Sequence, residues 1–169
     1  GKPPKATNPP WDGGFTWETS EDGSPWIGVS CQSNGAHIWY PCKEHPSDKS
    51  IGADIFITVP DPLMAISNGL LQSVNSQKNK WSKWHWKTKY PISTYNINIT
   101  IGNFSTIEKE AYVLNEPLSL VYYVLPEKEN GGYELLDEAE EHIRFYASHF
   151  GQYPWIDEKF GLVHTPYSG

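Results

Sequence analysis

The sequence predicts a mainly β protein: a sandwich or open saddle of strands, followed by one helix and a final strand. Short runs rich in β-branched and aromatic residues recur from Trp26 to Leu125, each bounded by turn-forming residues. After Pro126 the apolar residues change to helical spacing. The chain has 169 residues, 38% hydrophobic and 14% aromatic, so it can bury a packed core.

The first 25 residues are predicted to form an ordered loop with docked aromatic side chains. They are rich in Pro, Gly and short polar residues, and the stretch from Pro9 to Gly14 is typical of a turn between extended pieces. The first predicted strand therefore begins at Trp26.

Seven segments are predicted as strands from their composition and from the breakers at their ends. They are Trp26–Ser30, Ala36–Tyr40, Ala53–Val59, Leu63–Val74, Trp81–Lys89, Thr94–Ile101 and Leu118–Leu125. Apolar residues alternate at period two from Ala53 to Val59 and again from Tyr95 to Ile101. In the second segment the other face is polar, which indicates a strand with one solvated face.

Trp84 and Trp86 share one face of the segment Trp81–Lys89. Two aromatic rings on one face can form a platform for sugars, or they can cover a sheet as part of a core or an interface. Packing is the favoured interpretation, because aromatic residues at period two are common in half-buried strands.

A helix is predicted from about Tyr133 to Phe150. Its apolar residues lie on one face: Leu136, Ala139, Ile143, Tyr146, Ala147 and Phe150. Gly151 is placed as the C-terminal cap, and Pro154 prevents the helix from continuing. The stretch from Phe160 to His164 is predicted as a strand, and we place a domain boundary at Pro126, where the pattern changes.

The charge of the chain argues against nucleic acid as a partner. With 13 basic and 20 acidic residues, the net charge is -7. Five lysines between Lys78 and Lys89 are interpreted as a solvated sheet edge rather than a phosphate-binding patch. No apolar run approaches the roughly 18 residues of a spanning helix, so no membrane span is expected in this segment.

The sequence does not distinguish a secreted or periplasmic protein from a cytoplasmic one. Cys31 and Cys42 are close enough in sequence to form a disulfide, but two cysteines do not settle whether they are bonded. The sequons that begin at Asn98 and Asn103 matter only in a glycosylating pathway, and coincidence explains them.

No metal-binding or catalytic pattern is present. The six histidines are His37, His45, His85, His142, His149 and His164. His142 and His149 are seven positions apart on the predicted helix, whereas a zinc site borne on a helix needs two histidines one turn apart. The chain also contains no H-E-x-x-H, no G-x-S-x-G elbow and no glycine-rich phosphate loop.

The segment from Gln32 to Lys49, with Tyr40-Pro41-Cys42 and Pro46 at its centre, strongly resembles the gluzincin aminopeptidases, the family of aminopeptidase N and leukotriene hydrolase. Further segments resemble the family in the same order: Val59-Pro60, Ser67-Asn68-Gly69, Pro91–Tyr95, Ile101-Gly102, Phe150–Trp155 and Pro166–Gly169. The resemblance therefore covers nearly the whole chain.

This resemblance implies a saddle-shaped N-terminal β domain in residues 1–126 and the beginning of a thermolysin-like catalytic domain in residues 127–169. It implies a zinc aminopeptidase that removes N-terminal residues from peptides with a free N-terminus. Zinc is expected in the full-length enzyme and not in this fragment, which we expect to be inactive alone. The remaining catalytic domain of the parent chain is the expected partner.

The resemblance also implies substrate-binding roles for Gln32, Tyr167, Ser168 and Gly169. Gln32 matches a residue that helps to hold the substrate's amino terminus, although it could instead satisfy a backbone group in a turn. Tyr167 resembles an aromatic residue of the specificity pocket, with packing as the alternative. Ser168 and Gly169 stand at the start of the family's G-x-M-E-N motif, and Ser168 replaces its first glycine.

Two other functions stay open at this point. One is a non-catalytic β-sandwich that binds carbohydrate or protein, with the carbohydrate form using Trp84 and Trp86 as its platform. The other is a catalytically dead homologue. Exposed, coplanar indoles would favour the platform, and indoles packed beneath a sheet would count against it.

Overall fold

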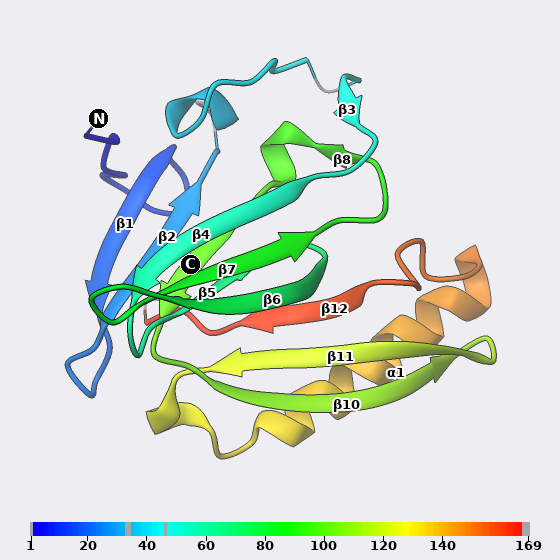
Figure 1. Cartoon of the computed structure of the whole chain (residues 1–169). Coiled ribbons are helices and arrows are strands. Elements are labelled where there is room, and N and C mark those ends of the chain that lie inside the picture. The colour runs from blue at the N-terminus through cyan, green and yellow to red at the C-terminus, as the bar shows by residue number, and fades with distance from the viewer. Residues whose placement is uncertain (1, 33–34, 46, 167–169) are drawn as a thin grey trace. The chain divides into compact units, whose positions relative to one another are not determined.

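A computed structural model describes residues 2–32, 35–45 and 47–166. These residues form two compact units, each described by itself below. The second unit is Phe104–His164, and the first consists of the described residues before it together with 165–166. The prediction of a mainly β chain with one long helix followed by a strand is confirmed (Figure 1).

The first unit contains an antiparallel sheet of four strands in the order β1-β2-β9-β5. Its strands are β1 (Gly14–Thr19), β2 (Pro25–Ser30), β5 (Met64–Ser67) and β9 (Ile99–Gly102). Strand β1 lies in the segment that was predicted as a loop, so that prediction is wrong. Strand β2 confirms the first predicted strand.

A second sheet of the same unit has the antiparallel order β4-β7-β6. Its strands are β4 (Asp54–Pro60), β6 (Leu70–Gln77) and β7 (Trp81–Lys87). The predicted strands at Ala53–Val59 and Trp81–Lys89 are confirmed here. A short pair, β3 (Lys49–Ser50) with β8 (Ile92–Ser93), completes the unit.

Trp84 and Trp86 belong to the core of the first unit. Their side chains are only 9% and 1% exposed, and the Trp86 indole donates a hydrogen bond to the backbone oxygen of Ala65 in β5, 2.8 Å away. This bond joins the two sheets directly. A platform for sugars needs exposed rings, so the burial of both indoles confirms the favoured packing interpretation and rules out the platform.

The predicted strand Ala36–Tyr40 is wrong, because Ala36–Ile38 forms the 3₁₀ helix η1. Gly35 precedes it with φ of 81°, a left-handed conformation that turns the chain away from an extended path. Glu44 then accepts a hydrogen bond from the backbone N–H of His37 at 3.0 Å, which holds the turn closed.

The predicted strand Leu63–Val74 is in fact two strands in different sheets. The chain turns at Gly69, where φ is 76°, so β5 pairs with β9 and β6 pairs with β7. A Cβ atom at Gly69 would lie 2.1 Å from the backbone oxygen of Lys87. Only glycine fits this turn without displacing β7.

The predicted strand Thr94–Ile101 is correct only in its second half. Thr94–Asn96 forms the 3₁₀ helix η2, and the strand β9 begins at Ile99. The backbone N–H of Ile97 donates to the oxygen of Thr94, so a local turn replaces the first sheet bonds.

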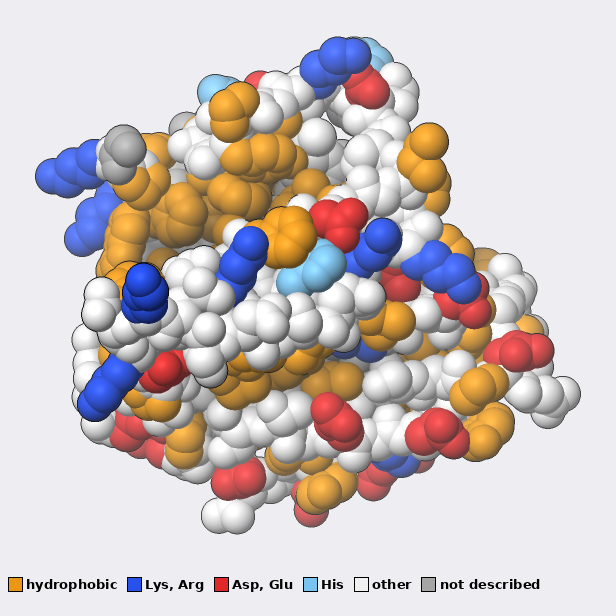
Figure 2. All heavy atoms as spheres, viewed as in Figure 1, with side chains coloured by type: hydrophobic (Ala, Val, Ile, Leu, Met, Phe, Trp, Pro, Cys, Tyr) orange, Lys and Arg blue, Asp and Glu red, His pale blue; other side chains and the backbone are white. Residues whose placement is uncertain are grey.

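The outer face of the sheet β4-β7-β6 carries alternating charges around one aromatic residue. Phe56 stacks on His85 with ring centroids 4.2 Å apart, and the Lys83 ammonium lies 4.4 Å from the centroid of Phe56. Asp54 lies 2.7 Å from His85 and 3.7 Å from Lys87. On the face that Figure 2 shows, basic, acidic and hydrophobic side chains are interspersed.

The second unit is a sheet of three strands in the order β10-β11-β12. Its strands are β10 (Ser105–Val113), β11 (Glu116–Val124) and β12 (Lys159–Val163). The first two form a hairpin, and β12 lies parallel to β11. Strands β11 and β12 confirm predictions, whereas β10 was not predicted. A short 3₁₀ helix, η3 (Pro126–Lys128), follows β11.

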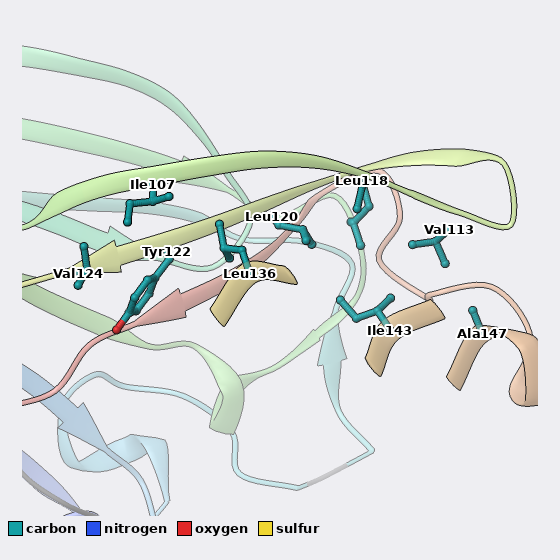
Figure 3. Packing of buried hydrophobic residues seen from close by; sticks show 10 residues of the cluster. Ile107, Val113, Leu118, Leu120, Tyr122, Val124, Leu136, Ile143 and Ala147 are labelled. Carbon is teal, nitrogen blue, oxygen red and sulfur yellow. The ribbon is translucent and has the colours of Figure 1, made fainter. Parts of the chain in front are cut away.

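Helix α1 (Gly132–Phe150) confirms the predicted helix and covers one face of this sheet (Figure 3). The buried cluster between them consists of Ile107, Ala111, Val113, Leu118, Leu120, Tyr122, Val124, Leu136, Ile143 and Ala147. Gly151 has φ of 94° and donates to the oxygen of Ala147 at 3.0 Å, which confirms the predicted cap.

The exposed side of α1 has two flanks of different chemistry. On one flank Glu140 accepts from Lys109 at 2.6 Å and from Arg144 at 2.5 Å. On the other flank, aromatic rings in mutual contact lie open to solvent. We call this the α1 aromatic surface; it consists of Phe145, Tyr146, His149 and Phe150. Within the described residues no helix is long and apolar enough to cross a membrane.

The domain boundary at Pro126 stays a prediction. The compact unit that contains α1 also includes β10 and β11, which lie before Pro126 in the sequence.

Candidate functional site

Gln32 lies two residues beyond the end of β2 and is exposed to solvent. Its carboxamide oxygen Oε1 accepts a hydrogen bond from the hydroxyl of Tyr95, 2.8 Å away. A carbonyl oxygen has two lone pairs, so one remains for a further donor. The side chain is therefore both accessible and oriented.

Tyr95 belongs to η2, and two hydrogen bonds fasten this turn to the segment around Tyr40 and Lys43. The Tyr40 hydroxyl donates to the backbone oxygen of Thr94 at 3.0 Å. The Thr94 hydroxyl donates to the backbone oxygen of Lys43 at 2.9 Å. Two of the segments on which the family resemblance rests are thus joined in space around Gln32 and Tyr95.

The groups beside this site are held in their neutral forms. Burial is the main cause that raises the pKa of the Tyr40 hydroxyl to about 12, and the nearby thiol of Cys42 adds to it. Burial also raises the pKa of the Cys31 thiol. Both cysteines are free, which answers the question of their pairing for this structure.

Glu44 is the carboxylate of the same segment. It accepts hydrogen bonds from the backbone N–H of His37 and from its ring nitrogen Nδ1. These bonds, the backbone one first, hold the pKa of Glu44 below its ordinary value. Glu44 is therefore ionised at neutral pH, and its carboxylate already accepts hydrogen bonds from His37.

The chemistry of a zinc site does not fit the described part of the chain. Nowhere in residues 2–32, 35–45 and 47–166 do three or more His, Cys, Asp or Glu residues come close enough to hold a metal ion. These residues do not form a zinc ligand set. What they provide is a hydrogen-bond acceptor at Gln32.

The predicted site residues have different outcomes. Gln32 is placed on the surface with an oriented carboxamide, whereas Tyr167, Ser168 and Gly169 lie outside the described residues. Tyr95 was not predicted as a partner of Gln32, because 63 positions separate the two residues and no local period relates them. The signal that was present is the segment Pro91–Tyr95, noted for its resemblance without a role.

Comparison with known proteins identifies relatives over most of the chain. Residues 13–96 match the Peptidase M1 N-terminal domain. Tricorn protease-interacting factor F2 of Thermoplasma acidophilum is 28% identical over 143 residues, which is 85% of this chain and 17% of that protein. Human glutamyl aminopeptidase is 28% identical over 91 residues, 54% of this chain and 9% of that protein.

The fold also matches that of solved structures. A two-domain M1 zinc metallopeptidase bound to L-arginine superposes with a TM-score of 0.74 at 20% identity, over 100% of this chain and 38% of that one. This chain thus spans less than a fifth of the length of either sequence relative. Residues 13–96 therefore belong to the N-terminal domain of the M1 peptidase family.

Proposed function

We propose that this chain is part of a zinc aminopeptidase that removes N-terminal residues from peptides, and that it contributes part of the substrate-binding wall. The single observation that carries the proposal within the chain is the exposed carboxamide of Gln32, whose oxygen is oriented by Tyr95. The match of residues 13–96 to the M1 peptidases, and the similarity of the fold to a zinc metallopeptidase, support the reaction class.

The proposed role of Gln32 is to accept a hydrogen bond from the free ammonium group of the substrate. A carboxamide oxygen is a good acceptor for an ammonium, and hydrogen bonds to charged groups are stronger than neutral ones. An internal peptide bond offers no ammonium, so this contact favours free N-termini. The neutral Tyr40 hydroxyl and Cys31 thiol do not compete for the positive charge.

Zinc and its ligands belong, in this proposal, to another part of a longer protein. Bound there, zinc would polarise the scissile carbonyl and activate water. Tyr167, Ser168 and Gly169 are proposed to line the same cleft.

The α1 aromatic surface supports the remaining catalytic domain as the partner of this chain. Phe145 and Tyr146 are each 60% exposed, and Phe150 is 82% exposed. Contiguous exposed apolar patches of this kind mark contact surfaces. We propose that further polypeptide of the same catalytic domain covers these rings.

Replacing Gln32 by alanine in the full-length protein should raise the Michaelis constant for peptides with a free N-terminus by about ten- to a hundredfold, the range for a lost hydrogen bond to a charged group. Steady-state kinetics with a dipeptide substrate provide the measurement. Gln72→Ala is the matched control, because Gln72 is also exposed but lies on β6. An unchanged Michaelis constant for Gln32→Ala would remove the assigned role.

The 169-residue chain alone is expected to hydrolyse no peptide, even when zinc is added, because its described residues contain no zinc ligand set. Release of the N-terminal residue from a fluorogenic substrate measures this. A mock preparation from cells without the gene controls for contaminating peptidases. Turnover clearly above that background would overturn the fragment proposal.

A further inference from the structure

We infer that Tyr95 is a positioning residue: it holds the carboxamide of Gln32 in the orientation that presents oxygen to the substrate's ammonium group. This inference rests on the proposed function of Gln32 and adds a second residue to it. The observation behind it is the hydrogen bond from the Tyr95 hydroxyl to Gln32 Oε1 at 2.8 Å.

The bond matters because Gln32 is exposed. A free glutamine side chain samples many rotamers, and fixing it costs on the order of 1 kcal/mol or more in conformational entropy. A glutamine that is already fixed before the substrate arrives avoids this cost on binding. Tyr95 donates to one lone pair of the oxygen, which leaves the other lone pair for the ammonium.

Tyr95 can act in this way because its own backbone is fixed. The backbone oxygen of Thr94 in η2 accepts a hydrogen bond from the Tyr40 hydroxyl, and the Thr94 hydroxyl donates one to the backbone oxygen of Lys43. On the other side of the turn, the Asn98 amide donates to the oxygen of Val29 in β2 at 3.1 Å. The turn is therefore tied on both sides to the segments that flank Gln32.

The same contacts give the Pro91–Tyr95 segment a function. The side chain of Tyr95 is 47% exposed, so burial in a core does not explain an aromatic residue at this position. Its hydroxyl meets Gln32, which is 63 positions earlier in the chain. The segment thus delivers a hydrogen-bond donor to the substrate-binding residue.

The test compares Tyr95→Phe, Gln32→Ala and the double variant in the full-length protein. Tyr95→Phe keeps the ring and removes only the donor. It should raise the Michaelis constant for free-amine peptides about three- to tenfold, the range expected when one side chain must be ordered on binding, with kcat nearly unchanged. The double variant should behave like Gln32→Ala alone, because Tyr95 acts only through Gln32.

Two controls separate positioning from general damage. Tyr133→Phe removes the hydroxyl of a tyrosine that is 62% exposed on α1, and it should leave the kinetics unchanged. The inhibition constant of a desamino peptide should not change in Tyr95→Phe, because this ligand has no ammonium. Equal weakening of the desamino ligand would show distortion of the cleft and would overturn the inference.

The failure of this inference can be told from the failure of the proposed function. If Gln32→Ala raises the Michaelis constant and Tyr95→Phe does not, the positioning role is wrong and the role of Gln32 stands. Multiplicative effects in the double variant would also reject it. If Gln32→Ala has no effect, the proposed function fails. The contact itself can still be tested by NMR of the Gln32 side-chain amide in this chain. Its signals should shift in Tyr95→Phe, and unshifted signals would reject the contact.

Discussion

Replacing Leu136 by alanine should lower the free energy of unfolding of the unit Phe104–His164 by about 3 to 5 kcal/mol, the cost of a cavity in a close-packed core. Leu136 has 0% exposure in the cluster that joins α1 to the sheet. Figure 3 shows its side chain between the helix and the strands, close to Leu120. Urea denaturation of the isolated chain measures the change.

Leu135→Ala is the matched control. Leu135 lies on the same turn of α1 but is 37% exposed, so less apolar surface returns to water on truncation. We expect a loss of about 1 kcal/mol or less for this control. Equal losses at the two positions would mean that the cluster does not stabilise the unit.

The second large effect is expected at Gly69. Replacement by alanine should destabilise the first unit by about 2 to 5 kcal/mol, because strain of the left-handed backbone adds to overpacking. The φ angle is 76°, and the new Cβ would lie 2.1 Å from the backbone oxygen of Lys87. The turn between β5 and β6 would have to move away from β7. Denaturant titration of the variant and of the parent chain gives the difference.

Gly23→Ala separates the two contributions. Gly23 has a similar φ of 84°, but a Cβ atom there would have no neighbour within 4 Å. This control should therefore show only the backbone strain, about 1 to 2 kcal/mol. A Gly69 variant no less stable than the Gly23 variant would contradict the steric argument.

The elements that the sequence predicted well are those whose pattern is local. Helix α1 buries the predicted apolar stripe as far as Ala147, whereas Tyr146 and Phe150 of that stripe are exposed. Strand β4 alternates buried and exposed side chains at successive residues. Each of these elements packs on one face only, so the spacing of its apolar residues in the sequence shows the period of the helix or strand. Strand β12 was likewise a short apolar run after a breaker.

The elements that were missed depend on contacts with distant residues. The hairpin turn between β10 and β11 uses Leu114 and Asn115 with φ of 47° and 72°, without the glycine or proline that usually marks such a turn. Glu108 and Glu110 place charges on the outer face of β10, which hid its apolar side. The pairing with β11 and the cover of α1 make it a strand.

The candidate site divides in the same way. Gln32 was predicted because a long, unusual segment resembles a known family, and family motifs preserve local spacing. Its hydrogen bond with Tyr95 depends on how η2 is tied to the distant segment around Lys43. Such a pairing follows from the fold and has no signal in the local sequence.

The arrangement of aromatic residues has a practical consequence for spectroscopy. Trp11, Trp17, Trp26, Trp39, Trp81, Trp84 and Trp86 belong to the first unit, and Trp155 is the one tryptophan of the second. The second unit in turn contains α1, the one α-helix in the described part of the chain. Indole emission therefore follows melting of the first unit and helical ellipticity that of the second, so two optical signals reveal whether both halves melt together.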